Sequence, residues 1–438
     1  MEPFSSSTFP PADTSTWQKQ VQQELKIDNA YETLRWYTAE GFTLEPYYTV
    51  DDLKKLPLQT IQLAQKQIPG WLNTPEYVVT DEKAANFLLR DAITRGADAL
   101  LLTLNTNTDL LRLLNGIKLS DIPILFRLQT EAINAAEFAQ QLKTVAPYQL
   151  KGGLLLSDDN YIAEVTRLTT DSPLFRTVYA SSQPFHNAGA SATQELAFTL
   201  ASLADTYDKL TDAGLPIEQL IPKTILSVSV GTSYFLEIAK LRALRVLLQR
   251  FLQHYSSTII HYPFIHAQTS TFYDATATPY TNLLRATTEA MAAIVAGCDA
   301  LTVNPYDTVL GERSDFSERI ARNVSLLLKD ESLFGKVTDP SAGSYYVETA
   351  TYQLVENAWA LFLNVEKQGG LTKAFANGYV QAEIEQAYQA KVEMVRQGNV
   401  IVGVTKFRSD EQINTLPKSV SSDITGQLPD RRLAEVFE

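Results

Sequence analysis

The stretch that decides the fold runs from His266 to Asn323 and reads HAQTSTFYDATATPYTNLLRATTEAMAAIVAGCDALTVNPYDTVLGERSDFSERIARN. Its polar start, His266–Ser270, follows an apolar segment that is predicted to be a strand. A helix is then predicted over Tyr280–Ala296, and the apolar run Ala300–Val303 is predicted to form the next strand. Polar residues therefore gather where strands end and helices begin, which is the edge of an α/β barrel that carries ligands and chemistry.

Outward from this stretch, short apolar runs alternate with longer helical segments from Trp71 onward. The predicted strands are Glu76–Val79, Ala97–Leu104, Pro123–Leu128, Gly152–Leu156, Arg176–Ala180, Thr224–Val230, Ser257–Ile265 and Ala300–Val303. The predicted helices are Glu82–Thr94, Asp109–Asn115, Ala132–Thr144, Tyr161–Leu168, Ala192–Ala213, Ser233–Gln253 and Tyr280–Ala296. Such alternation predicts a parallel sheet, and eight units over about 250 residues predict an α/β fold of the TIM (β/α)8 barrel type over residues 71–335. A doubly wound open sheet is the alternative, but no Gly-x-Gly-x-x-Gly follows a strand.

The regions on either side of the barrel have different compositions. Residues 1–70 are predicted to form an N-terminal extended arm, whose large side chains Trp36, Tyr47 and Tyr48 pack either on the barrel or on a partner subunit. Residues 336–407 are predicted to form a helical extension, with a turn and a short strand over Asp339–Glu348 ahead of its helices. Residues 408–438 have the composition of a linker tail.

The overall composition restricts the class of protein. A net charge of -13 disfavours binding to nucleic acid. The single cysteine, Cys298, cannot form an internal disulfide, which fits a reducing compartment. No apolar run reaches the roughly 20 residues needed to cross a bilayer, and the start of the chain does not have the pattern of a signal peptide. We therefore expect a cytoplasmic protein with no membrane partner.

Few residues offer polar chemistry. The four histidines, His186, His254, His261 and His266, have no zinc-site neighbours, so no metal site is predicted. His266 stands at a predicted strand end and is either a functional group or a buried structural one. Ser227 and Ser229 share one face of a strand, and either line a polar barrel axis or face outward. In the helix after Gly231, Glu237, Lys240 and Arg245 are expected to face water.

Several runs in the same order resemble the barrel domain of the methylmalonyl-CoA mutase family. The matching runs are His-x-Gln-Thr-Ser at His266–Ser270, Pro-Tyr-x-Asn with Glu-Ala-Met-Ala-Ala at Pro279–Ala293, Arg-Ile-Ala-Arg-Asn at Arg319–Asn323, Gly343–Glu348 and Val400–Val404. The resemblance extends from about residue 180 to 405, and it is weak between Trp71 and Phe175. It implies a barrel that threads coenzyme A along its axis beneath adenosylcobalamin, the cofactor of a radical isomerisation.

The departures from the family pattern bear on activity. The family's Tyr-His pair before Ala-Gly-Ala is replaced by Gln183 and Pro184, and proline has no side-chain donor for a thioester carbonyl. The family's substrate arginine is replaced by Phe264, which cannot pair with a carboxylate. The family has His-Thr-Asn at the end of one strand. In this sequence Thr302 replaces the histidine of that run, whereas Asn304 matches its asparagine. The cobalamin motif Asp-x-His-x-x-Gly is absent from the sequence.

These losses resemble the small, non-catalytic subunit of heterodimeric mutases. The resemblance implies a barrel without a cobalamin-binding domain that stabilises a catalytic large subunit, with acyl-CoA and cofactor handled by that partner. A remnant pocket is expected at His266, Gln268, Ser270 and Asn304. The alternative is an independently active acyl-CoA mutase that uses a separate cobalamin-binding chain. An open axis would favour that alternative, and a filled axis would favour the small subunit.

Overall fold

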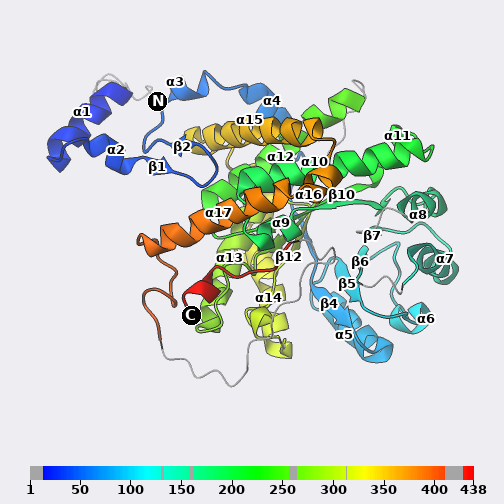
Figure 1. Ribbon diagram of the computed structural model, residues 1–438. Helices are drawn as coiled ribbons and strands as arrows, with labels where there is room; N and C mark the ends of the chain where they lie inside the picture. The colour runs from blue at the N-terminus through cyan, green and yellow to red at the C-terminus, as the bar shows by residue number, and fades with distance from the viewer. Residues whose placement is uncertain (1–12, 130–132, 157–160, 256–263, 312, 410–427) are drawn as a thin grey trace, which may run out of the picture.

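The computed structural model describes residues 13–129, 133–156, 161–255, 264–311, 313–409 and 428–438. Its centre is a pair of parallel five-stranded sheets (Figure 1). The first sheet has the order β4 (Glu76–Val79), β5 (Leu100–Leu104), β6 (Ile124–Leu128), β7 (Gly152–Leu155) and β8 (Phe175–Arg176). The second has the order β3 (Leu72–Asn73), β12 (Ala300–Thr302), β11 (Phe264–Thr269), β10 (Thr224–Val230) and β9 (Val178–Ser181).

The two sheets are joined through consecutive strands at both edges. Strand β3 leads into β4, and β8 leads into β9, so the strands succeed one another in the order of an eight-membered α/β ring. The strands nevertheless do not form one continuous hydrogen-bond ladder, because β3 and β4, and likewise β8 and β9, belong to different sheets. Pro75, which has no N–H to donate, separates β3 from β4, and the N–H of Thr177, between β8 and β9, bonds to Lys223 of the second sheet (3.0 Å). The predicted α/β fold with parallel strands is confirmed, whereas one closed and continuous barrel is not observed.

Helices cover the outward faces of both sheets, because alternate strand residues such as Leu102, Phe126 and Leu226 point outward into the main core. The helices that follow the strands are α5 (Glu82–Thr94), α6 (Leu110–Leu113), α7 (Ala135–Val145), α8 (Ile162–Leu168), α9 (Gln183–Ala188), α10 (Ala192–Asp212), α11 (Ile217–Leu220), α12 (Tyr234–Tyr255), α13 (Pro279–Val295) and α14 (Asp315–Leu326). Every predicted helix of this region is present, and the short helices α9 and α11 are additions. No helix in the described ranges combines the length and the apolarity that a membrane crossing requires.

The prediction that charged residues of α12 face water is wrong. Glu237, Lys240 and Arg245 are all buried, because α12 lies beneath α15 and beside α10 and α13. Each finds an ionic partner there: Lys240 pairs with Glu237 (2.7 Å), and Arg245 pairs with Asp299 (3.1 Å). The middle of α12 is therefore covered by other helices, and its exposed residues lie near its ends.

The region after the sheets is helical, with α15 (Tyr345–Lys367), α16 (Leu371–Ala376) and α17 (Tyr379–Arg396). The short strand expected before Glu348 is instead the first turn of α15. The Ser344 hydroxyl accepts from the N–H of Val347 and caps that turn. The cap stabilises a helix there despite the β-propensity of the aromatic and branched residues.

The N-terminal arm divides into an exposed head and a packed stem (Figure 1). The head holds α1 (Thr14–Leu25), which has no buried residue, α2 (Ala30–Leu34) and the hairpin of β1 (Trp36–Tyr37) and β2 (Thr43–Leu44). Within it, Trp17 stacks on Tyr47 with ring centroids 5.1 Å apart. The stem holds α3 (Val50–Leu53) and α4 (Leu58–Leu63), both against α15, and the Tyr48 ring meets that of Tyr346.

Candidate functional site

The amino-end half of the space between the sheets is filled with apolar side chains. Four buried residues from both sheets form a cluster of their own: Leu101, Leu125, Leu155 and Ile225. Tyr179 and Phe264 pack against this cluster. The Arg176 guanidinium carbon lies 4.0 Å from the centre of the Phe264 ring, in a cation–π contact. A cavity of about 170 Å³ remains beside Phe264, and Leu125 and Arg176 also line it.

Toward the carboxyl ends of the strands, the interior becomes polar, and His266 is fully buried there. The Thr302 hydroxyl donates its one proton to the Thr74 carbonyl oxygen (2.6 Å), so it must accept from His266 Nε2–H (2.8 Å). Nδ1 of the same ring therefore accepts from the Ser227 hydroxyl (2.8 Å). Burial, reinforced by the nearby positive charge of Arg127, lowers the pKa of His266 to about 3. The imidazole is neutral, with each nitrogen committed to a neighbour.

A second polar group lies next to His266 and is centred on Gln268. The Gln268 amide donates to the side-chain oxygen of Asn304 (2.9 Å) and accepts from the side chains of Gln183 and Arg127. Arg127 in turn forms an ion pair with Glu76 (2.8 Å), and both side chains are largely buried. Burial alone raises the pKa of Glu76, but the positive charges of Arg127 and of Arg313 lower it below its ordinary value. The side chains of this group therefore bond mainly to one another.

The predicted remnant pocket is only partly assembled. His266, Gln268 and Asn304 lie together in this interior, and Ser227 faces it as well, so the outward orientation considered for that serine is wrong. Gln183 joins the network, and Pro184 stands beside it in α9 without a side-chain polar contact. Both line a hollow of about 400 Å³. Ser270 instead points to a different set of partners. His261 lies outside the described residues.

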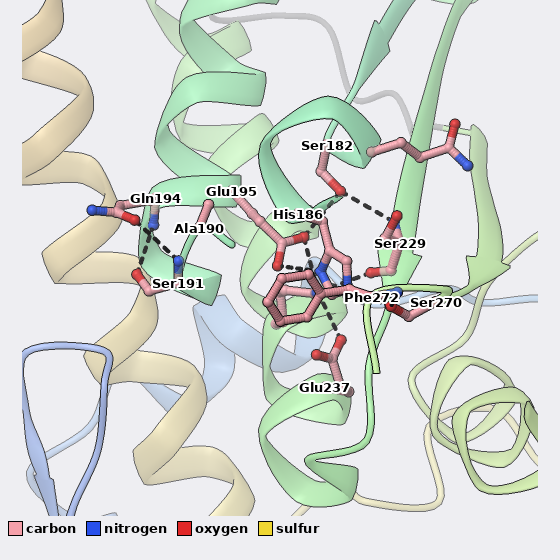
Figure 2. Close-up of polar contacts among 12 residues, drawn as sticks. Ser182, His186, Ala190, Ser191, Gln194, Glu195, Ser229, Glu237, Ser270 and Phe272 are labelled. Carbon is pink, nitrogen blue, oxygen red and sulfur yellow. Dashed lines mark hydrogen bonds and ion pairs between the residues drawn. The ribbon is translucent and has the colours of Figure 1, made fainter. Parts of the chain in front are cut away.

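That different set is a relay that the sequence interpretation missed (Figure 2). His186 on α9 joins Glu195 through Nδ1 (2.8 Å) and Ser270 through Nε2 (2.7 Å). The carboxylate of Glu195 also accepts from Lys240 (3.0 Å). Burial raises the pKa of Glu195, but the charges of Lys240 and His186 lower it to about 2, so the carboxylate is ionised. Glu195 precedes the apolar run Leu196–Phe198 of α10, and this was a weak sequence signal for a buried carboxylate.

The relay borders a hollow of about 530 Å³, which His186, Glu195 and Glu237 line together with arm residues such as Trp36. Its serine is buried, and the Ser270 hydroxyl oxygen accepts from the N–H of Phe272 (3.0 Å) in addition to its contact with His186. The described residues also contain no group of three or more His, Cys, Asp or Glu arranged to hold a metal ion. The geometry is that of a structural network.

These features define a class: an α/β protein whose polar groups collect at the carboxyl ends of parallel strands, above an apolar interior. The family model described as methylmalonyl-CoA mutase matches residues 157–436, and the chain belongs to this family.

Similar proteins include both subunit types. The chain is 34% identical over 414 residues to the methylmalonyl-CoA mutase small subunit of Porphyromonas gingivalis, covering 86% of this chain and 66% of that protein. It is 29% identical to the small subunit of Streptomyces virginiae, covering 99% of this chain and 76% of that one. The large subunit from Porphyromonas gingivalis is 35% identical over 269 residues, which are 60% of this chain and 36% of the relative. The chain therefore spans about two thirds of its small-subunit relative from Porphyromonas.

The residues present do not fit a corrinoid. Both ring nitrogens of His186 and of His266 are occupied by hydrogen bonds, and His254 lies on α12, where its ring packs beside Trp359. No described histidine is therefore free to ligate cobalt at the carboxyl ends of the strands. The segment Leu428–Glu438 also lies across that face and buries Leu433 against Phe272. We derive no chemistry through that cofactor in this chain.

Proposed function

We propose that this chain is the small subunit of a heterodimeric methylmalonyl-CoA mutase, and that it stabilises a catalytic large subunit without turning over substrate itself. In this proposal adenosylcobalamin and acyl-CoA are bound by the assembled enzyme through its partner, and the reaction is the interconversion of methylmalonyl-CoA and succinyl-CoA. Residues 71–335 would then be a barrel of the acyl-CoA mutase type, divided into two sheets.

One observation carries the proposal: an apolar cluster occupies the amino end of the space between the sheets, and the polar groups around His266 at the carboxyl end are bonded to one another. Phe264 and four aliphatic side chains fill the amino end. At the carboxyl end, His266 is neutral and bonded at both nitrogens, so neither nitrogen remains to polarise a carbonyl. Pro184, which replaces the histidine of the resembling family, has no side-chain donor.

The alternative is an independently active mutase with a separate cobalamin-binding chain. That alternative requires an open axis, and the apolar cluster with Phe264 counts against it. It predicts that coenzyme A binds the isolated chain with measurable heat. The small-subunit proposal predicts no such binding.

The exposed head of the arm is the proposed contact for the large subunit. Trp36 and Tyr37 expose 44% and 59% of their surfaces, and Leu25 and Leu34 are exposed beside them in the chain. Aromatic side chains that remain this exposed are typical of interaction sites. Tyr47 and Tyr48, also expected at the contact, are engaged within the arm and with α15.

The test is a titration of this chain with a methylmalonyl-CoA mutase large subunit, followed by multi-angle light scattering. We expect a one-to-one complex at micromolar concentration, which the double variant Trp36→Ser/Tyr37→Ser weakens by more than about tenfold. The matched control is Phe87→Ser, which removes an aromatic residue exposed to 73% on α5, away from the arm. Two chains that remain separate at micromolar concentration, or isomerisation of methylmalonyl-CoA by this chain and a corrinoid alone, would overturn the proposal.

A further inference from the structure

The segment Leu428–Glu438 crosses the carboxyl-end face of the sheets. The N–H of Arg431 donates to the carbonyl of Asn187 in α9 (2.9 Å), and the N–H of Leu433 donates to that of Phe272 after β11 (2.8 Å). The segment, drawn in red in Figure 1, therefore bridges the ends of β9 and β11. The sequence predicts a linker here, but Leu433 and Ala434 are buried.

Side chains fix the same segment farther along. Arg432 donates to the carbonyl of Asp274 (3.2 Å) and pairs with Glu438 (3.0 Å). The Glu438 carboxylate in turn accepts from the hydroxyl of Thr276 (2.7 Å) and from the N–H of Ala277 (3.0 Å). The loop after β11 is thus held to the segment by backbone and side-chain bonds together.

One short segment forms a wall of both large hollows. Leu428, Pro429 and Asp430 line the hollow of about 400 Å³ beside Gln183. Leu433 lines the hollow of about 530 Å³ beside His186. Moving this segment would therefore open both hollows at once.

The way the segment is attached makes it separable from the core. Its only helical turn, Ala434–Val436, is too short to be stable without these contacts. Leu428, Arg432, Leu433 and Ala434 are buried, while the remaining positions are partly or fully exposed. A unit with few buried apolar side chains and many bonds near solvent opens at a lower free energy than the strands beneath it.

We propose that Leu428–Glu438 is a latch that holds the carboxyl-end face of this chain shut, and that a ligand or second domain reaches this face only when the latch is displaced. The latch acts as one cooperative unit with the loop that follows β11. This inference does not depend on the non-catalytic role, because a closed face can belong to an active or an inactive chain.

Hydrogen exchange followed by mass spectrometry tests the latch in the full chain. The N–H groups of Arg431, Leu433 and Ala277 should exchange with one common opening free energy, below that of β10. The variants Arg432→Ala and Glu438→Gln should each speed exchange at Arg431 and Leu433 by about tenfold and leave β10 unchanged. Arg396→Ala, which removes an exposed ion pair with Glu393, is the matched control.

Two outcomes would overturn the latch. One is protection at Arg431 and Leu433 equal to that of β10 in the unaltered chain, which would mean that the segment opens only when the whole protein unfolds. The other is a local effect of Glu438→Gln at Thr276 and Ala277 with no change at Arg431, which would mean that the contacts are independent. The first measurement needs no variant, so it stands even if a substitution impairs folding.

Discussion

The two sheets differ in the balance of apolar and polar side chains that they present to the space between them. In the first sheet the inward positions of β5, β6 and β7 carry leucine, at Leu101, Leu125 and Leu155. In the second sheet the inward positions of β10, β11 and β12 include Ser227, His266 and Thr302. The family match, residues 157–436, contains the second sheet from β9 to β12 and leaves out β4 to β7.

The comparison teaches that the resemblance to the family and the polar interior occupy the same half of the molecule. The half outside the match fills the interior with aliphatic side chains. The first sheet also carries polar side chains, because Arg127 of β6 contacts Glu76 of β4 in the same sheet as well as Gln183 and Gln268. Arg127 joins the two halves, and the predictions below start from it.

The largest effect is expected for Arg127→Met. The substitution removes the nearer of the two cations that pair with Glu76 and leaves Arg313 (3.3 Å), so we expect a loss at the lower end of the roughly 3–5 kcal/mol that breaking a buried ion pair costs. Urea unfolding followed by circular dichroism measures the loss. The double variant Glu76→Leu/Arg127→Met should recover part of it, since the buried carboxylate is then gone although Arg313 loses its partner. Arg112→Met, at an ion pair on the surface, is the control and should change little.

A smaller effect is expected for Leu125→Ala in the apolar cluster. Truncation of this buried side chain removes contacts with both sheets and leaves a cavity, which costs about 2–4 kcal/mol. The same urea measurement applies. A loss below about 1 kcal/mol would mean that the space between the sheets collapses freely or is already open to water, and the filled-axis argument would fail.

The polar half should reveal itself in the pH dependence of stability. Burial lowers the pKa of His266 to about 3 in the folded chain, whereas the pKa of a histidine in the unfolded chain is 6.5. Between these two values the unfolded chain binds a proton at this residue and the folded chain does not. Stability from this residue is therefore present above pH 6.5 and is lost as the pH falls toward 3.

The measurement is the unfolding free energy of the wild-type chain and of His266→Gln between about pH 5.5 and about pH 7.5. Below pH 6.5 the slopes should differ by up to about 1.4 kcal/mol per pH unit, and above it they should converge. His254→Gln should keep the wild-type slope, because that side chain is exposed on α12. Equal slopes for His266→Gln and the wild type would contradict a neutral buried imidazole.

The smallest effect concerns a region outside both sheets. Trp36→Ser in the arm should change the stability of the isolated chain by about 1 kcal/mol or less, because 44% of the residue's surface is exposed. Thermal unfolding measures this. A large loss would show that the arm is part of the core, and its proposed role as a contact for a partner would lose its basis.

Local rules accounted for much of the fold. Helix α5 begins and ends where it was predicted, because Asp81 accepts from the N–H of Ala84 (2.7 Å) and apolar residues recur at helical spacing behind it. The first turn of α15 was missed, since the side-chain cap at Ser344 competed with strand-forming residues. The order of the strands followed from alternation, but the division into two sheets did not, because it depends on which neighbour each N–H finds.

The candidate site was predictable only in part. The sequence placed His266 just after a strand, and this was wrong because β11 (Phe264–Thr269) carries it within the strand. The replacements Gln183, Pro184 and Phe264 could be recognised by their chemistry. The sequence did not indicate the relay of His186 with Glu195 or the burial of Lys240. The spacing of apolar residues predicts a helix, but it does not predict how many other helices pack around that helix.

The sequence by itself determined where strands and helices alternate, which turns are capped, and which acid–base groups are lacking. Only the tertiary structure decided how the remaining polar groups are used. Gln268 meets Arg127 across 141 positions of the chain, and the latch meets α9 across more than two hundred. A buried polar group is inert or available according to whether its hydrogen bonds are already made, and those partners come from distant parts of the chain.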